Sequence, residues 1–272
     1  MKITDKNCLI GVVGLGHLGS SIVEALLNGG VSQEKLMVSF KGSKSTLERA
    51  QKMGIASCLT DTKKLMSKAD IIILAAKPQD FAAVSAHSVR KDALVMSFMA
   101  AIPLRILEKS FDCHVCRVMC SGPETITSGH GAAVLLPSLP LAESVLAAAS
   151  VNIFQVSSES EIDAFTVGIC IPPILMNIEI SEKARRQAIL AMEADFPVYQ
   201  RLGEWIELEL QAAAADKKES CLENVSTKGG ISEAMINSLQ NDGSFARALE
   251  RGMKRCREIC AAISAKLDAN AA

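Results

Sequence analysis

The sequence predicts an α/β protein, with an N-terminal Rossmann-type doubly wound sheet followed by an all-helical C-terminal domain. Three observations lead to this prediction. Short apolar runs, typical of parallel strands buried on both faces, alternate with helix-period segments through the first half of the chain. A glycine-rich turn follows the first of these runs. From Glu159 onward long helical patterns replace the β-branched runs, so we predict a dinucleotide-binding domain over residues 1–158 and a helical domain over residues 159–272.

The first apolar run, residues 9–13, ends in the turn Gly14-x-Gly16-x-x-Gly19 and continues as an amphipathic helix. In a nucleotide-binding turn of this type the first glycine permits a tight bend, the second lets the backbone approach a pyrophosphate, and the third lets the helix pack on the sheet. The helix N-terminus adds unpaired N–H groups and the positive end of a dipole. The alternative is a glycine-rich turn in some other α/β protein. We predict that the cofactor is bound by Gly14, Gly16, His17, Leu18 and Gly19.

The segment after the second predicted strand, residues 36–40, indicates which dinucleotide binds. Sites for NAD usually place an Asp or Glu about 20 residues beyond the glycine turn, where it bonds the ribose 2′-hydroxyl. Here Ser39 holds that place, and the loop after it contains Lys41, Ser43 and Lys44. Hydroxyl and ammonium groups suit a 2′-phosphate, which a carboxylate would repel. We therefore predict NADP as the cofactor, with NAD less favoured; ordinary solvated loop lysines are the alternative that keeps NAD open.

Two later strands should end beside the same cofactor, because ligands of doubly wound sheets bind at the carboxyl ends of the strands. Residues 70–76 form a continuous apolar run that leads into Lys77-Pro78, and residues 93–100 form another. For Lys77 the alternative is a solvated loop lysine. We predict cofactor contacts at Ala76, Lys77, Pro78 and Ala100.

The remaining elements continue the alternation and then change to helices. Further strands are predicted after Gly54 and at residues 114–119, 131–136 and 152–156, with helices at 46–53, after a cap at 60–62, and at 103–109. In the second half, residues 188–215 and 245–267 are predicted as helices, and Ser232 with Glu233 can cap another. A helical domain with so much small apolar surface predicts pairing with a second copy, as a homodimer or larger homo-oligomer.

Composition argues against several classes of partner. The chain has 272 residues and a net charge of −1, with no basic stripe that would indicate nucleic acid or an anionic membrane. It shows neither a run of membrane-spanning length nor the apolar core of a signal peptide, so we expect a cytoplasmic location. The nine cysteines are odd in number, and the cluster Cys113, Cys116 and Cys120 lacks a further ligand at zinc-site spacing. We expect reduced structural thiols and no metal site.

Five stretches together resemble the pyrroline-5-carboxylate reductase family over nearly the whole chain. They are IGVVGLGHLGSSI from Ile10, AAKPQ from Ala75, SFMAAIPLRIL from Ser97, RVMCSGP from Arg117 and VSTKGGISEAMINSL from Val225. The resemblance implies that these stretches are the cofactor turn, the Lys-Pro strand end, the strand beside the nicotinamide, the turn near it, and the substrate loop. It also implies a helical dimerisation domain whose interface shapes the active site.

By this resemblance the expected reaction is NAD(P)H-dependent reduction of the cyclic imine 1-pyrroline-5-carboxylate to proline. Backbone N–H groups of a Gly-Gly turn at a helix start suit a carboxylate. Ser232 stands where the family has a threonine near the imine nitrogen, and is the expected catalytic residue. A helix cap with a tight turn would explain the same residue types without catalysis. The expected contacts of the imino or amino acid substrate are Gly229, Gly230 and Ile231, flanked by Ser226 and Thr227.

The chain departs from the family pattern at several places. The Asn-Thr-Pro turn reads Cys120-Ser121-Gly122-Pro123, the Gly-Ser-Gly-Pro-Ala-Tyr stretch reads Cys170-Ile171-Pro172-Pro173-Ile174-Leu175, the Ala-Gly pair reads Ala100-Ala101, and Lys228 replaces a proline. These changes keep open a second hypothesis, a catalytically lapsed NADP-binding sensor or interaction protein of the same fold. A third, a dehydrogenase of the 3-hydroxyisobutyrate type, would need a catalytic lysine on a long helix, for which Lys183 is the nearest candidate.

Overall fold

The computed structural model describes residues 8–216 and 228–271. These residues group into two compact units. The division falls after Ile153, and the residues from Ile263 onward group with the first unit. The functional division into a dinucleotide-binding domain over residues 1–158 and a helical domain over residues 159–272 stays a prediction.

The first unit is built on an eight-stranded sheet in the order β3-β2-β1-β4-β5-β6-β7-β8. The strands β1 to β6 pair in parallel, and β7 runs antiparallel to β6. This is the doubly wound Rossmann-type arrangement that the sequence predicts. The strands are β1 Ile10–Val13, β2 Leu36–Ser39, β3 Leu59–Thr60, β4 Ile71–Leu74, β5 Leu94–Ser97, β6 His114–Cys120, β7 Ala132–Leu136 and β8 Asn152–Phe154.

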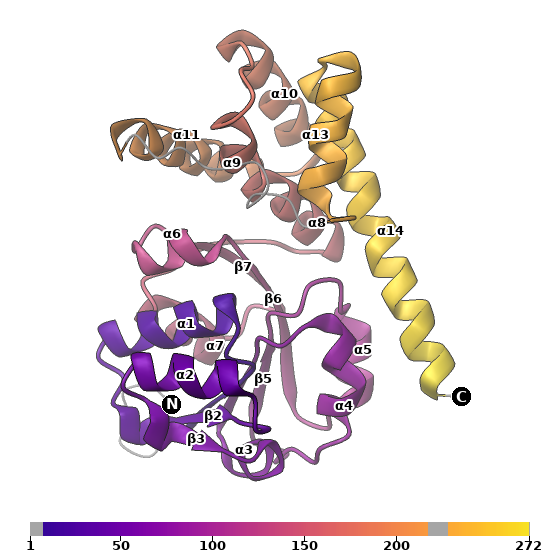
Figure 1. Ribbon diagram of the computed structural model, residues 1–272. Helices are drawn as coiled ribbons and strands as arrows, with labels where there is room; N and C mark the ends of the chain where they lie inside the picture. The colour runs from indigo at the N-terminus through magenta and orange to yellow at the C-terminus, as the bar shows by residue number, and fades with distance from the viewer. Residues whose placement is uncertain (1–7, 217–227, 272) are drawn as a thin grey trace. The chain divides into compact units, whose positions relative to one another are not determined.

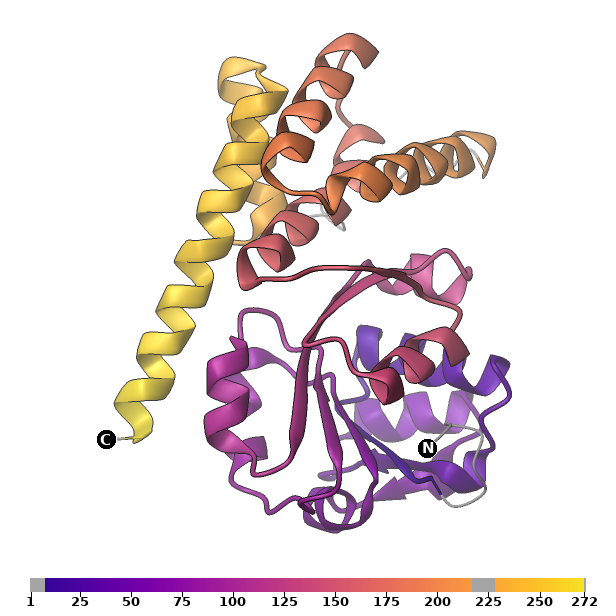
Figure 2. The ribbon, with the colours of Figure 1, turned by 180° about the vertical axis from the view of Figure 1, so that it is seen from behind.

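Helices cover both faces of this sheet, as Figures 1 and 2 show from opposite sides. One face packs against α1 His17–Asn28, α2 Lys44–Lys52, α6 Pro123–Thr127 and α7 Pro140–Ala148, and the other against α3 Thr62–Lys68, α4 Phe81–Ser85 and α5 Leu104–Ser110. Neighbouring residues of one strand serve the two cores: Ile71 and Ile73 face the first, and Ile72 and Leu74 face the second. Because both faces are buried, the central strands read as unbroken apolar runs.

The second unit is helical and is centred on α8 Glu159–Ile169, in which every residue from Glu161 to Gly168 is buried. Figures 1 and 2 both show α13 running beside the first half of α14. The other helices of this part of the chain are α9 Ile171–Leu175, α10 Glu182–Asp195, α11 Tyr199–Asp216, α13 Ile231–Asp242 and α14 Phe245–Ala271.

Two sequence expectations in the helical half are wrong. Residues 188–215 do not form one helix, because Pro197 lacks an N–H and Phe196 before it is extended, with φ −135 and ψ 99. The chain therefore breaks between α10 and α11. Ser232 is not the cap of α13, since the helix begins at Ile231 with Gly230 at its N-cap. Ser232 lies inside the first turn instead.

Candidate functional site

The three glycines of the predicted cofactor turn have different surroundings. Gly14 has φ +99, and a Cβ there would lie 2.7 Å from the backbone nitrogen of Ala76. A Cβ on Gly19 would lie 1.9 Å from the carbonyl oxygen of Gly14. Gly16, at the N-cap of α1, is exposed, and a Cβ there would meet nothing within 4 Å. Backbone geometry and packing thus require glycine at the two ends of the turn, while the middle position leaves open space above the helix N-terminus.

The turn lies where the strand order reverses, between β1 and β4. The chain continues in parallel past the strand ends, because the N–H of Ala75 donates to Val13 O at 2.8 Å and the N–H of Phe98 donates to Leu74 O at 2.9 Å. The residues that follow β1, β4 and β5 therefore share one edge of the sheet. Such a crevice is where doubly wound sheets bind their ligands. The predicted cofactor residues at this edge are Gly14, Gly16, His17, Leu18, Gly19, Ala76, Lys77, Pro78 and Ala100.

The loop after β2 contains the residues predicted to select NADP. The Ser39 hydroxyl accepts the N–H of Gly14 at 3.1 Å and is nearly buried, so it holds the glycine turn in place. Ser43 pairs with the Ser45 hydroxyl at 2.9 Å, and Lys44 lies 3.7 Å from Glu48. In the described part of the chain, Lys41 is an exposed cation of this loop without an ion-pair partner. Lys41 is therefore the loop cation best placed to meet an added phosphate.

Arg49 is a residue of this site that sequence reasoning missed. Its guanidinium Nη1 donates to the Leu15 carbonyl at 2.6 Å, which brings an arginine from α2 against the glycine turn. An arginine near the ribose is one way in which Rossmann folds accommodate a 2′-phosphate. No spacing rule marks Arg49, because only the packing of α2 against the turn brings it there.

The turn after β5 carries backbone strain. Ala101 has φ +61, in the left-handed region that favours glycine, and it is 5% exposed. This conformation costs a non-glycine residue roughly 1–2 kcal/mol. The chain thus keeps the backbone shape expected of an Ala-Gly pair although its residues are Ala100 and Ala101.

The turn after β6 uses its polar side chain internally. The hydroxyl of Ser121 accepts the N–H of Ala132 at 2.9 Å and lies 2.6 Å from the Thr125 hydroxyl. Ser121 is 3% exposed, so its side chain cannot also reach a ligand in this arrangement. Burial raises the pKa of the neighbouring Cys120 thiol to about 12, which keeps that group neutral. Neither residue supplies the amide that the family turn would place beside the cofactor.

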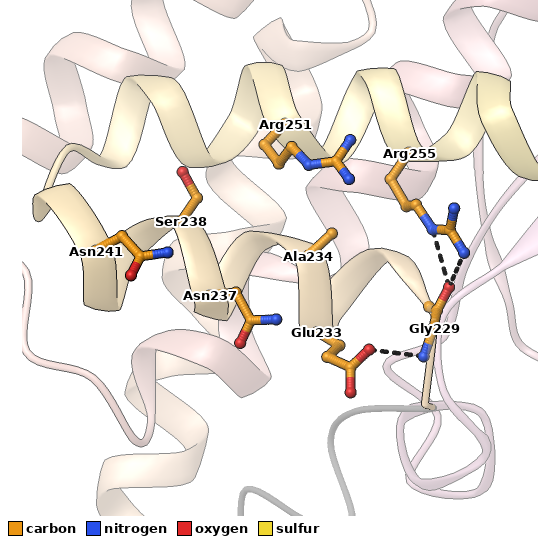
Figure 3. Close-up of a pocket in the computed structure, with 9 residues that line it drawn as sticks. Gly229, Glu233, Ala234, Asn237, Ser238, Asn241, Arg251 and Arg255 are labelled. Carbon is orange, nitrogen blue, oxygen red and sulfur yellow. Dashed lines mark hydrogen bonds between the residues drawn. The ribbon is translucent and has the colours of Figure 1, made fainter.

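In the second unit, a cavity of about 530 Å³ lies between α13 and α14 (Figure 3). Gly229, with φ +73, begins this site, and both polar groups of its backbone are held. Its N–H donates to Glu233 Oε2 at 2.6 Å, and its carbonyl accepts from Arg255 Nε at 2.9 Å and Nη2 at 2.6 Å. The cavity is lined by Gly229, Gly230, Glu233, Ala234, Asn237, Ser238, Asn241, Arg251 and Arg255.

These contacts reduce the expected carboxylate donors from three backbone N–H groups to two. The N–H of Gly229 is engaged with Glu233, whereas Gly230 and Ile231 have no acceptor among the described residues. Both N–H groups lie at the positive end of the α13 dipole. Arg255 comes from a helix far along the chain, so its contact with the turn has no signal in the sequence. Ser226 and Thr227, the other expected substrate residues, lie outside the described residues.

Ser232, the expected catalytic residue, does not line this cavity. Its side chain lies near the thiol of Cys170, which donates to Thr166 O at 3.2 Å. Burial raises the pKa of that thiol, and the nearby Ser232 partly opposes the rise. Cys170 begins the stretch that replaces Gly-Ser-Gly-Pro-Ala-Tyr, so the structure places that departure from the family pattern close to the first turn of α13. Nearby Tyr199 is fully buried and donates to Ala164 O at 3.1 Å, which accounts for its hydroxyl structurally.

Comparison with known proteins places this chain among oxidoreductases. A family model described as NADP oxidoreductase, coenzyme F420-dependent, matches residues 9–101. Pyrroline-5-carboxylate reductase 2 of Bacillus subtilis (strain 168) is 28% identical over 273 residues, covering 92% of this chain and 94% of that protein. The pyrroline-5-carboxylate reductase of Methanosarcina acetivorans is 29% identical over 128 residues, covering 45% of this chain and 47% of that protein.

Solved structures support the fold. A pyrroline-5-carboxylate reductase from Coxiella burnetii has a TM-score of 0.58 at 22% identity, covering 93% of this chain and 99% of that one. The Plasmodium falciparum pyrroline carboxylate reductase, solved with NADP bound, has a TM-score of 0.57 at 17% identity, covering 94% of this chain and 98% of that one.

The fold, the glycine turn and the family match define the class of this protein: it is a Rossmann-type oxidoreductase. Within that class, the chain is similar to pyrroline-5-carboxylate reductase 2 of Bacillus subtilis over 92% of its length, in keeping with the resemblance that its sequence motifs show. Among the described residues, no helix is both long and apolar enough to cross a membrane.

Proposed function

We propose that this protein uses NADPH to reduce a cyclic imine that carries a carboxylate, as in the reduction of 1-pyrroline-5-carboxylate to proline. The observation that carries the proposal is the Gly229 turn. Arg255 holds its carbonyl and Glu233 holds its N–H, so the turn is preorganised at the start of α13. The relative from Bacillus subtilis, named for this reaction, aligns along 92% of the chain and adds support.

The residues have separate tasks in this proposal. The N–H groups of Gly230 and Ile231 bind the substrate carboxylate at the positive end of α13, which fixes its orientation. The imine nitrogen must gain a proton, which Ser232 or a water supplies. Gly16 lets the backbone approach the pyrophosphate, and Lys41 with Arg49 favours a 2′-phosphate. The bound cofactor supplies the hydride.

Two arginine variants test the role of the turn. Arg251 and Arg255 each contact Glu258 at 3.1 Å, but only Arg255 also binds the Gly229 carbonyl. Arg255→Gln should raise the KM for the imine about fivefold, since a partly exposed charge-assisted hydrogen bond contributes about 1 kcal/mol. Arg251→Gln removes another arginine that lines the cavity but leaves the Gly229 carbonyl bonded, so it should raise that KM less than Arg255→Gln does. Equal effects of the two variants on KM would contradict the assignment of the turn.

A second candidate function is nucleotide binding without turnover. The specific observation in its favour concerns Ser121, which stands in the place of the family asparagine. Its hydroxyl is already hydrogen-bonded to the Ala132 N–H and to the Thr125 hydroxyl. An assay of purified protein with NADPH and a panel of cyclic imines, followed at the nicotinamide absorbance, separates the two candidates. Tight NADPH binding with no oxidation by any imine would favour the second. Ser232→Ala should lower turnover more than it lowers NADPH affinity; equal losses would remove Ser232 from the catalytic step.

We also propose that the helical half pairs with a second copy, giving a homodimer or larger homo-oligomer. Light scattering across a wide concentration range tests this, and a monomer throughout would refute it. The cytoplasmic location stays a prediction.

A further inference from the structure

The helices α8 and α14 bring a carboxylate and two thiols together in a part of the second unit that the proposed function does not use. Asp163 lies on α8, and Cys256 and Cys260 lie on α14. The Cys256 sulfur is 3.2 Å from Asp163 Oδ1, and one ligand atom from each of the three residues lies within 4.8 Å of the others. Asp163 is 9% exposed and Cys256 is 4% exposed.

Close helix packing places these groups in register. A Cβ on Gly252 would lie 3.2 Å from Val167 on α8 and 3.0 Å from Met235 on α13, so the three helices approach closely at this glycine. Cys256 follows Gly252 by one helical turn, and Asp163 precedes Val167 by one turn. The two helices therefore run in opposite directions, and the Cys256 thiol faces the Asp163 carboxylate.

Among the described residues, the buried Asp163 carboxylate has no cationic partner. Within residues 8–216 and 228–271, Asp163 has no ion pair, and its hydrogen-bond donor is the thiol of Cys256. A thiol is a weak donor, and burying a carboxylate without a cation or strong donors is costly.

The same three side chains make a suitable ligand set for a soft divalent metal. Thiolates and carboxylates both bind Zn²⁺, and Zn–S bonds of about 2.3 Å place tetrahedral sulfur ligands about 3.8 Å apart. The observed spacing needs only small side-chain movements to reach that geometry. Cys260 is partly exposed, which provides a path for the ion.

We propose that Asp163, Cys256 and Cys260 bind one Zn²⁺ ion or a similar thiophilic divalent cation, with water completing the coordination. On binding, the two thiols each lose a proton to solvent, two metal–sulfur bonds and one metal–oxygen bond form, and the metal gives up water molecules; nothing is oxidised or reduced. The ion links α8 to α14 and gives the Asp163 carboxylate a cationic partner, while the net charge of the cluster stays the same because two protons leave. Sequence spacing does not reveal this site, because its ligands come from helices far apart in the chain.

Cobalt substitution is a direct test, since Co²⁺ occupies zinc sites and its thiolate complexes absorb by sulfur-to-metal charge transfer. The reduced, metal-free full-length protein should take up one equivalent of Co²⁺ with this absorption, and Zn²⁺ should displace the Co²⁺ and bleach the band. The double variant Cys256→Ser with Cys260→Ser should lose the band. Cys170→Ser, which removes a different partly buried thiol of the same unit, should keep it.

A second measurement requires no variant. Zn²⁺ should protect the partly exposed Cys260 of the wild-type protein from maleimide labelling, read by mass spectrometry of peptides, while Cys113 stays reactive. It should also raise the unfolding temperature, because a ligand that binds only the folded state stabilises it. Absence of charge-transfer absorption in the wild type, an unchanged band in the double variant, or unchanged labelling with Zn²⁺ would each overturn the proposal.

Discussion

The glycine turn allows one methyl group to be added at two positions with different expected consequences. Gly16→Ala places the methyl in open space, since nothing lies within 4 Å of that Cβ and the backbone angles there, φ −75 and ψ −164, suit any residue. We expect the free energy of unfolding to change by no more than about 1 kcal/mol, the cost of a poorer helix cap. The methyl blocks the approach of a pyrophosphate to the backbone. Losing one hydrogen bond to a charged group costs about 1.5–3 kcal/mol, so NADPH should bind roughly 10- to 100-fold more weakly.

Gly19→Ala adds the same methyl against the backbone, because the new Cβ would lie 1.9 Å from the Gly14 carbonyl oxygen. Overpacking costs about 1–3 kcal/mol, and about 2–3 kcal/mol where the methyl meets backbone as it does here, while the better helix propensity of alanine returns about 1 kcal/mol. We expect a net loss of about 1–2 kcal/mol and a fall of roughly 2–8 °C in the unfolding temperature without nucleotide. NADPH affinity should also fall, since the clash displaces the turn.

Calorimetric titration with NADPH and thermal unfolding followed by circular dichroism would measure the two effects separately. Gly16→Ala should change only one of the two: its unfolding temperature should stay near that of the wild type, while its binding of NADPH should be weaker. A well-folded Gly16→Ala protein that binds NADPH as tightly as the wild type would refute the assignment of this turn to a pyrophosphate. A Gly19→Ala protein with unchanged unfolding temperature would refute the steric argument.

Three further predictions test other parts of the first unit. Ala101→Gly should leave the free energy of unfolding in urea unchanged or raise it, because relief of about 1–2 kcal/mol at the positive φ exceeds an entropy cost of about 0.5–1 kcal/mol. The Ala101→Gly protein should also be more stable than the control Ala100→Gly, and the reverse order would contradict the prediction. Burial raises the pKa of Cys116 from 9.0 to about 12, so its contribution to stability is present below pH 9 and lost as the pH rises to 12, by up to about 1.4 kcal/mol per pH unit. Cys116→Ala should flatten that part of the stability profile, and an unchanged slope would count against it. Lys41→Glu should weaken NADPH roughly fivefold and spare NADH, since exposed charge pairs contribute about 1 kcal/mol, and equal losses would separate Lys41 from the 2′-phosphate.

The fold could be predicted from sequence because its signals are local. Ile71 to Leu74 form an apolar run because both of its faces are buried, and Gly14 and Gly19 are glycines because the turn admits no Cβ there. The strand ends then follow from the parallel order of the sheet. By contrast, the break at Pro197 was missed because the helical pattern around it outweighed one proline.

The candidate site could be predicted only in part, because several of its contacts join distant segments. Arg255 meets Gly229 only after α14 packs beside α13, and Arg49 meets Leu15 only after α2 folds against the glycine turn. The position of Ser232 depends on where α13 begins. In a helix that starts at Ile231, the Ser232 side chain lies near Cys170 and does not line the cavity that begins at Gly229. A one-residue difference in a helix start thus decides which group a side chain faces.

Gly16 is a glycine that the structure of the protein itself does not require. Its φ and its empty surroundings would admit any residue, so neither the fold nor the packing explains a glycine there. The close approach of a ligand to the backbone does explain it. Two residues that differ from the family pattern, Ser121 and Cys170, are instead explained by the fold, because each is hydrogen-bonded to a backbone group of its own unit. The proposal of nucleotide binding therefore rests on a feature that only a ligand requires. The proposed choice of imine rests on the Gly230 and Ile231 donors, and we expect it to differ from the family substrate where Ser121 and Cys170 replace the family motifs.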